Sequence, residues 1–506
     1  MKNIISLIFI IFIFLISCNK NNQATSSISG IGDITINPYK LTPLSAVYRT
    51  SSINASPITV TVKGQHGEED LIHTYPAGYG NEFEIHGLYP ECNNTITVND
   101  GGRIITKNEY VGSISYKGLS IPSKFEVKIN NLEEEKYPNN PDMYFIISNE
   151  YGFVIATSRN GYTRYFIENV TGSKIVIDNK KIILYPGYNT VEYNNLDLLG
   201  KSVLYIKDDI HHDVIKVGNN YLFLSSSIYG VNDRLTIMDS YGNFTKELKF
   251  GPLIKNTLDF NMYPEDKDMV NKIVFGEDVN NINKDSSGSS ISADWFHGNS
   301  LVYDPSTDIL YVSSRTRGVL AIDYSEWKLI WWMADESINT AVVTTYSLIP
   351  YDNHFKDLKS LDYYRVKGDA LNDGPKNQHA LFLLPNGNLA MFDNQGDENS
   401  NSEGSRYVEY QITGEPGNWT AKKVSQYRDP SLYSRVTSDV DLVGENYNNI
   451  LISYGYPTAR ILEVEKNLPQ NILFRLDLPY YIYRSDKMPL YYDEGRVYSE
   501  DCNLKN

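Results

Sequence analysis

The sequence predicts an all-β protein in which a small β domain precedes a β-propeller of six blades. Short apolar or alternating stretches recur along the chain between clusters of Gly, Asn, Pro and Asp, which is the pattern of strands joined by tight turns. Tyrosine, a residue favoured in strands, occurs 40 times. After about residue 140 one strand–turn–strand plan returns at intervals of about 60 to 90 residues, and no helical pattern longer than a turn or two interrupts it.

The start of the chain is expected to direct export. Lys2 precedes the apolar run from Ile4 to Ile16, which is shorter than the roughly 20 residues that span a bilayer. The run ends in "LISC", so we expect a lipoprotein signal peptide over residues 1–17, lipid attachment at Cys18 and a flexible tether over residues 18–30. An ordinary signal peptide cut nearby is the alternative. The expected location is outside the cytoplasm, lipid-anchored in the periplasm or at the cell surface.

Charge and cysteine content limit the classes of partner. The formal net charge is −16, which argues against a nucleic-acid partner because such proteins present a basic face. A local cluster of Arg and His could still oppose this charge and bind a small anion. Only Cys92 and Cys502 remain besides Cys18, so a Cys-rich metal site is excluded, whereas one disulfide is compatible with export.

Residues 31–130 are expected to form the small β domain, and residues 140–506 the propeller. Strand patterns such as "ITVTVKG", "NEFEIHGLYP" and "SKFEVKINNL" fill the first region. The charged, Pro-containing stretch "EEEKYPNNPDM" then separates the two regions.

Four later segments share one plan, in which a strand, a tight turn and a second strand are followed by an outer strand pair. They begin at His211, His297, Gln378 and Val436; an example is "HGNSLVYDPSTDILYVSSR" followed by "GVLAIDYSEWKLIWWM". Four strands per unit is the composition of a propeller blade. Residues 143–167 and 174–194 match the plan more weakly, and about 60 residues per blade then gives six blades.

The histidines occupy matching positions in these hairpins. His297 and Arg315 are equally far from the turn near residue 306, so an antiparallel pair brings them to one end, and alternation places Asn299 on the face of His297. The same folding brings His379, and either His211 or His212, to the corresponding end of their hairpins. Because propeller blades converge on an axis, these side chains are expected to meet in one site. The other four of the chain's eight histidines show no such register.

At these residues the sequence resembles the PAPS-independent bacterial aryl-sulfate sulfotransferases. The shared motifs are "DWFHGNS" with "DPSTD" and "SSR" (294–315), "QH" with "LPNGN" and "FDN" (378–394), and "SRYVEY" (405–410). "NPYKLTPLSA" and "FEIHGLYP" look like the family's N-terminal β-sandwich. The resemblance covers nearly all of the mature chain.

The resemblance implies an active site in the central channel of a six-bladed propeller. His379 would be the nucleophile and would become a transient sulfohistidine in ping-pong transfer from a phenolic sulfate ester to a phenol. His297, Asn299 and Arg315 fall on the family's sulfate-binding positions. The "HHD" motif supplies a further histidine: the motif favours His212, whereas counting from the following strand favours His211. No cofactor is implied, and a homodimer is allowed. The family's usual "QHD" reads "QHA" here, with Ala380.

The residue types suit this chemistry. Neutral imidazole is both a nucleophile and a leaving group, and Arg, Asn and His can donate hydrogen bonds to developing negative charge. One histidine could protonate the leaving phenolate. Three alternatives remain open: a metal site, which a guanidinium aimed at the same point disfavours; a quinone-binding propeller, suggested by "AIDYSEWKLIWW"; and an exported module that binds carbohydrate or protein without catalysis.

Overall fold

The computed structural model describes most of the chain after residue 30. The described residues are 31–498 apart from 149–150, 171, 179–180, 187–192, 207, 209, 227–232, 268–282, 285–289, 292–294, 337–353, 396–402, 495 and 497. Helices are few and short, and none within these ranges has the length and apolar character that crossing a membrane requires. The predicted signal peptide and tether, including Cys18, lie outside the described residues.

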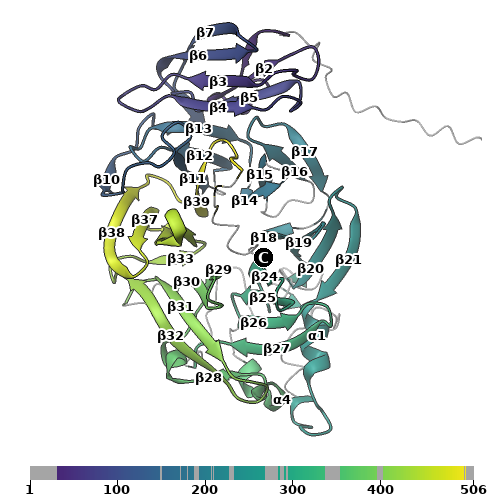
Figure 1. Ribbon diagram of the computed structural model, residues 1–506. Helices are drawn as coiled ribbons and strands as arrows, with labels where there is room; N and C mark the ends of the chain where they lie inside the picture. The colour runs from purple at the N-terminus through teal and green to yellow at the C-terminus, as the bar shows by residue number, and fades with distance from the viewer. Residues whose placement is uncertain are drawn as a thin grey trace, which may run out of the picture.

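The N-terminal domain is a sandwich of two antiparallel sheets, as predicted (Figure 1). In β3 the burial alternates strictly between buried and half-buried residues, because only one face of its sheet contacts the core. One sheet has the order β1-β2-β5, with bounds Ile34–Ile36, Ser45–Arg49 and Glu82–His86. The other has the order β4-β3-β6-β7, with bounds Leu71–Tyr75, Ile58–Val62, Cys92–Asp100 and Arg103–Val111. A small hairpin follows, made of β8 (Ile114–Tyr116) and β9 (Leu119–Ile121).

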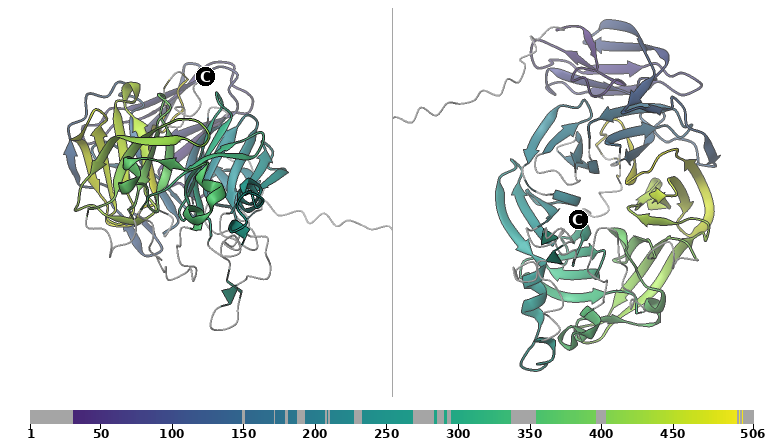
Figure 2. Two further views of the ribbon diagram at one scale, coloured as in Figure 1. Left: turned by 90° about the horizontal axis from the view of Figure 1, so that it is seen from below. Right: turned by 180° about the vertical axis from the view of Figure 1, so that it is seen from behind.

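Within the described ranges, six sheets of four or five strands follow one another around a ring (Figures 1 and 2); their strands pair antiparallel, except that the short outermost strand β28 pairs with β32 in parallel. In order around the ring, the first three sheets are β39-β11-β12-β13 (Arg484–Pro489, Asp142–Ser148, Phe153–Thr157, Thr163–Glu168), β14-β15-β16-β17 (Gly172–Asp178, Lys181–Pro186, Tyr193–Asp197, Ser202–Ile206) and β18-β19-β20-β21 (Ile210–Val217, Asn220–Ser225, Arg234–Asp239, Phe244–Lys249). The fourth sheet is β24-β25-β26-β27 (Gly298–Asp304, Ile309–Ser314, Gly318–Asp323, Lys328–Met333). The last two have a fifth, outermost strand: β29-β30-β31-β32 with β28 (His379–Leu383, Leu389–Asp393, Arg406–Thr413, Trp419–Arg428, Val366–Lys367), and β34-β35-β37-β38 with β10 (Asp439–Val443, Asn449–Tyr454, Arg460–Glu465, Leu468–Asp477, Val127–Asn130). This arrangement is the predicted β-propeller.

The two ends of the propeller chain join in one sheet. The C-terminal strand β39 pairs with β11, in the register Asp142↔Pro489 to Ile147↔Arg484. Each sheet has an inner edge strand, called its first strand from here on. The first strands contact one another in turn around the centre of the ring, in the order β14, β18, β24, β29, β34 and β39. β10, which the sequence groups with the N-terminal domain, pairs instead with β38 on the propeller.

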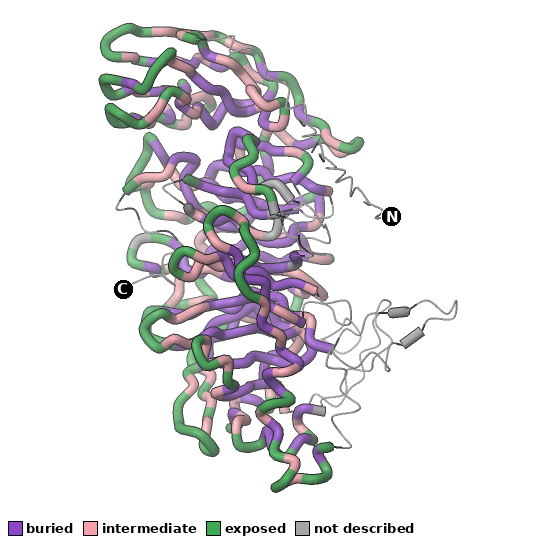
Figure 3. The backbone as a smooth tube through the Cα atoms, turned by 90° about the vertical axis from the view of Figure 1, so that its right-hand side faces the viewer, coloured by how far each residue is buried: buried purple, intermediate pink, exposed green. Residues whose placement is uncertain are grey.

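Short elements connect the sheets. They are α1 (Phe250–Thr257), α3 (His354–Asp357), α4 (Lys359–Asp362), the 3₁₀ turns Asp369–Asp373 and Glu445–Tyr447, and the strands β22 (Asn283–Lys284), β23 (Ser290–Ile291), β33 (Ser434–Val436) and β36 (Tyr456–Pro457). The buried residues follow the strands, whereas exposed residues gather in the turns (Figure 3).

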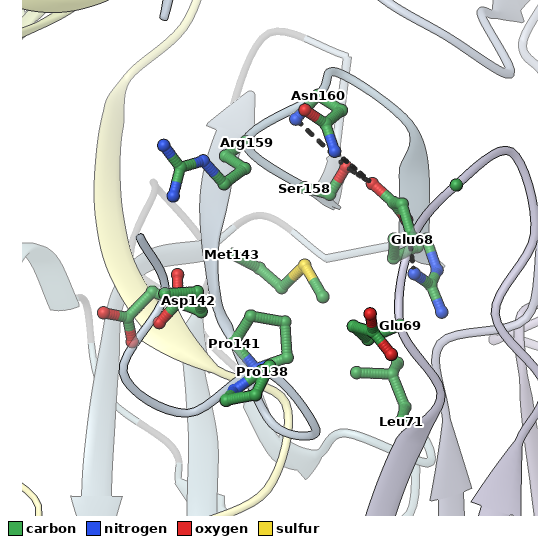
Figure 4. A pocket seen from close by; sticks show the side chains of 13 residues that line it. Glu68, Glu69, Leu71, Pro138, Pro141, Asp142, Met143, Ser158, Arg159 and Asn160 are labelled. Atoms are coloured by element: carbon green, nitrogen blue, oxygen red, sulfur yellow. Dashed lines mark hydrogen bonds and ion pairs between the residues drawn. The ribbon is translucent and has the colours of Figure 1, made fainter. Parts of the chain in front are cut away.

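The two domains share an apolar core that runs from the sandwich into the first propeller sheet. At their junction Arg164 on β13 donates to the carbonyl oxygen of Gly87 at 2.7 and 3.0 Å and to Glu68 at 2.6 Å. A cavity of about 160 Å³ opens beside this contact (Figure 4). Glu68 also accepts a hydrogen bond from Asn160 at 3.3 Å, so polar groups on its wall bond to one another. None of the predicted site residues lines this cavity.

Candidate active site

Three of the predicted histidines lie together near the centre of the ring. His212 comes from β18, His297 directly precedes β24, and His379 begins β29. The ring centroid of His212 is 5.1 Å from that of His297 and 6.0 Å from that of His379. Residues far apart in sequence are thus brought together because neighbouring sheets converge at their first strands.

The backbone at each histidine departs from a regular strand. The first ladder of each sheet shifts register near its histidine, between Ile210 and Val214, Gly298 and Ser300, and His379 and Phe382. Positive φ angles accompany these bulges: 65° at His212, 51° at His297 and 50° at Ala380. Such angles cost a non-glycine residue about 1–2 kcal/mol each, and bulges of this kind redirect side chains. The surrounding sheets therefore hold these side chains in positions that a regular strand would not provide.

His379 is buried, and the contacts of its Nδ1 define its protonation. Nδ1 lies 3.0 Å from the carbonyl oxygen of Asn377 and 2.8 Å from Oδ1 of Asn394. Both neighbours are acceptors, so Nδ1 carries the hydrogen and Nε2 the lone pair. The pKa of His379 is lowered to about 3, mainly by burial; the hydrogen bonds to Asn394 and Asn377 oppose this shift, and the charges of Arg315 and His297 add to it. His379 is therefore neutral at physiological pH.

His212 bridges His297 and a tyrosine from the C-terminal part of the chain. Its Nε2 lies 3.1 Å from Nε2 of His297, so one of these two atoms donates a hydrogen to the other. Its Nδ1 lies 2.5 Å from the hydroxyl of Tyr483, which directly precedes β39. The Tyr483 main chain is held in turn by a 2.7 Å hydrogen bond from its N–H to the carbonyl of Ile147. No motif of the sequence marks Tyr483 as a residue of the site.

His297 and Asn299 contact different neighbouring sheets. The main-chain N–H of Arg315 donates to the carbonyl of His297 at 3.0 Å, so these residues lie at one end of their hairpin, as predicted. Asn299 is fully buried, and its Nδ2 donates to the carbonyl of Gln378 at 2.7 Å. The His297 side chain thus contacts His212 of the preceding sheet, whereas the Asn299 side chain contacts Gln378, which directly precedes the first strand of the next sheet. The expected common face of these two residues was wrong because the bulge at Gly298–Ser300 breaks the alternation.

Side chains close to the histidines in sequence connect neighbouring sheets. Oδ2 of Asp213 accepts a hydrogen bond from the main-chain N–H of Leu301 at 2.8 Å. In the next sheet, Oγ of Ser300 accepts one from the N–H of Leu381, also at 2.8 Å. Ala380 holds the corresponding position in the third sheet and has no side-chain oxygen for such a bond. The alanine in "QHA" therefore removes a connection between sheets and leaves the histidine cluster in place.

Two expected residues cannot be placed. The side chain of His211 and the whole of Asp294 lie outside the described part of the chain. Trp295, which follows Asp294, is completely buried, and its carbonyl accepts from Arg317 Nε at 2.7 Å. Trp295 is therefore anchored in the core two residues before His297.

Carboxylates rather than histidines form the candidate cation cluster. Among the described residues, Asp439, Asp441 and Asp486 are the side chains whose ligand atoms lie within 4.8 Å of one another. Arg484 Nε lies 3.9 Å from Asp439, which offsets charge there.

The histidine cluster offers a neutral imidazole with an available Nε2, a nearby guanidinium and a His–His–Tyr chain that can carry a proton. This combination suits nucleophilic transfer of an anionic group.

Sequence comparisons identify the family to which the chain belongs. The family model "Arylsulfotransferase (ASST)" matches residues 128–479, and the model "Arylsulfotransferase Ig-like domain" matches residues 33–109. A protein from Lelliottia amnigena named arylsulfate sulfotransferase is 28% identical over 199 residues, which cover 36% of this chain and 32% of that protein. Its namesake from Escherichia coli O6:H1 is 26% identical over 180 residues, covering 34% and 29%. The matched region thus spans about a third of each relative.

Solved structures with a similar trace share little sequence. The β-propeller domain of Cps50 (Swd1) from Myceliophteria thermophila aligns with a TM-score of 0.34 and 10% identity, covering 70% of this chain and 90% of that domain. BamB from Moraxella catarrhalis aligns with a TM-score of 0.28 and 12% identity, covering 78% and 87%.

Proposed function

Since this chain belongs to the arylsulfotransferase family, we propose that it moves a sulfuryl group from an aryl sulfate ester to a phenol, without PAPS, through a covalent intermediate on His379. The observation that carries this proposal is the state of His379: buried, neutral, protonated on Nδ1 and with its Nε2 lone pair available. In the first half-reaction Nε2 forms a bond to sulfur while the bond from sulfur to the phenolic oxygen breaks. In the second, the acceptor oxygen bonds to sulfur and Nε2 departs.

The remaining residues have roles that follow from their contacts. The leaving phenolate needs one proton and the acceptor phenol must lose one; the hydrogen between Nε2 of His212 and Nε2 of His297 serves both steps, with the Tyr483 hydroxyl behind it. Arg315 supplies positive charge for the sulfonate oxygens. Asn299 fixes the carbonyl of Gln378 beside His379 and has a second N–H for the sulfonate.

We further propose that the protein is exported and anchored through a lipid on Cys18. Its support is the apolar run that ends in "LISC". A Cys18→Ala variant should appear in the soluble fraction and should not incorporate a labelled fatty acid. Lipid labelling that persists in that variant would contradict the anchor.

The central test follows phenol release from an aryl sulfate with and without an added phenol acceptor. We expect the wild type to need the acceptor for turnover, and the His379→Asn variant to be inactive. Digestion after a pulse of donor alone should recover one sulfuryl group on the peptide that contains His379. Release that needs His379 but no acceptor would indicate a hydrolase, and release that needs neither would reject the proposal.

A further inference from the structure

Asn394 occupies a special position beside His379. It directly follows β30 and is fully buried. Its Nδ2 donates to the carbonyl oxygens of Ser434 at 2.8 Å and Thr437 at 3.3 Å. Its Oδ1 lies 2.8 Å from Nδ1 of His379. The side-chain amide therefore bridges two neighbouring sheets and ends on the proposed nucleophile.

The two carbonyls fix which way the amide points. A carbonyl oxygen can only accept, so the NH₂ group of Asn394 must face Ser434 and Thr437. The flipped amide would set its oxygen against two carbonyl oxygens, where that oxygen would have no donor, although the carbonyl of Ser434 would keep its 3.2 Å hydrogen bond from the Ser405 hydroxyl. Oδ1 therefore faces the imidazole as an acceptor, and the hydrogen that it requires sits on Nδ1. The carbonyl of Asn377 accepts from the same atom at 3.0 Å and points to the same tautomer.

We propose that Asn394 is a positioning residue that holds His379 in the Nδ1–H tautomer, so that Nε2 is the atom that attacks sulfur. The catalytic consequence rests on the proposed function of His379, whereas the tautomer itself is a property of the resting protein. An amide suits this role because it orients the ring without adding negative charge. A carboxylate at the same place would stabilise the imidazolium and raise its pKa. Nε2 would then be protonated, and would lose its lone pair, at pH values where the wild-type ring is still neutral. Three further groups face the ring: Arg315 and His297 disfavour the imidazolium, and the ring of His212 lies edge-on with its centroid 6.0 Å away.

The direct test is nitrogen NMR of the full chain labelled with ¹⁵N-histidine, with the His379 signals assigned through their loss in His379→Asn. In the wild type we expect His379 to be neutral and protonated on Nδ1 throughout the neutral pH range. In Asn394→Ala the Nε2–H tautomer should become populated. In Asn394→Asp the ring should titrate at a higher pH than in the wild type.

Asn54→Asp is the matched control. Asn54 is also buried, and its Nδ2 also donates to two carbonyls, those of Ser56 at 2.8 Å and Pro76 at 2.7 Å, but it lies in the N-terminal domain. A merely structural asparagine would change thermal stability alone, as we expect for Asn54→Asp. Identical His379 tautomer and titration in the wild type and both Asn394 variants would overturn the proposal.

Kinetics separate this inference from the proposed function. We expect Asn394→Ala to lower kcat by about 10- to 100-fold, the usual cost of losing a group that orients a reacting side chain. Asn394→Asp should add an acid limb to the pH–rate profile, with the rate falling below the raised pKa of His379. If the wild type transfers no sulfuryl group while the NMR changes occur, the proposed function fails and the tautomer assignment stands. If His379 is essential but neither readout responds to position 394, the role of Asn394 is wrong.

Discussion

His379 is an unusual histidine because the fold keeps it neutral by burial. Its pKa is about 3 in the folded protein against 6.5 for an ordinary histidine, so between these values the unfolded chain binds a proton that the folded protein does not. The free energy of unfolding must therefore decrease as the pH falls through this interval, by up to about 1.4 kcal/mol per pH unit from this residue. Above pH 6.5 the contribution is constant.

The His379→Asn variant should lack this pH-dependent loss. We expect its stability relative to the wild type to increase steadily as the pH is lowered from about 6.5 towards 3, because Asn does not titrate. Urea unfolding at a series of pH values measures the difference, and contributions common to both proteins cancel. A difference that does not vary with pH would show that His379 titrates normally.

Tyr483 is expected to act through His212. Replacing it with Phe removes the hydroxyl 2.5 Å from Nδ1 of His212, so the proton for the leaving phenolate is less well supplied. We expect the rate to fall by about 10- to 100-fold. The loss should be largest for donors with weakly acidic phenols, because these leave only with a proton.

Tyr480→Phe is the control for this prediction. Tyr480 is buried, and its hydroxyl has no hydrogen-bond partner among the described residues, so its removal should leave the rate and its dependence on the leaving phenol unchanged. Equal effects of the two substitutions would contradict a role for Tyr483 in proton transfer.

At the scale of elements, the side-chain bonds between first strands hold the histidines in register. Ser300 accepts from the buried N–H of Leu381, two residues after His379. Ser300→Ala should lower the free energy of unfolding by about 1–3 kcal/mol, since it leaves that N–H without its acceptor. Urea unfolding measures this cost, with Ser113→Ala as the reference; Ser113 is exposed in the N-terminal part of the chain, and we expect a change within about 0.5 kcal/mol. Similar values for both variants would show that the contact between β24 and β29 does not need this bond.

The sequence predicts those parts of the site that depend on local pairing. His297 and Arg315 belong to one hairpin, so their distances from the turn were enough to bring them together. Repetition of the hairpin plan then placed His212 and His379 nearby. The prediction that His297 and Asn299 share a face was wrong, because strict alternation along a strand does not account for a bulge such as the one between Gly298 and Ser300.

Other features depend on contacts that no local pattern contains. Tyr483 lies 271 residues from His212 in sequence, and it reaches the site only because the C-terminal strand returns to the first propeller sheet. β10 likewise reads as one more strand of the N-terminal domain until its partner β38 is known. Asn394 is part of a motif, but its role depends on carbonyls from β33 and the turn after it.

For the whole molecule, Arg484 is a charged link where the ring closes. It lies on β39, is buried, and its guanidinium is 3.6 Å from Asp213 on β18 and 3.9 Å from Asp439 on β34. The pKa of Asp439 is raised to about 7, mainly by burial and against the opposing charge of Arg484. The C-terminal strand β39 thus places a positive charge, Arg484, beside buried carboxylates of two other sheets. Arg484 directly follows Tyr483, the tyrosine that contacts His212.

Removing this charge should weaken closure of the ring. We expect Arg484→Met to lower the free energy of unfolding by about 3–5 kcal/mol, because buried carboxylates lose their counter-ion, although Lys174 remains 3.2 Å from Asp213. Arg475→Met is the comparison: Arg475 pairs with Asp477 at 2.8 Å on the surface, where such a pair contributes less than about 1 kcal/mol. Urea unfolding at neutral pH measures both. Equal losses in the two variants would mean that the buried charge adds nothing to the hydrogen bonds between β11 and β39. A larger loss in Arg484→Met than in Arg475→Met, as expected, would make the buried charge part of what closes the ring.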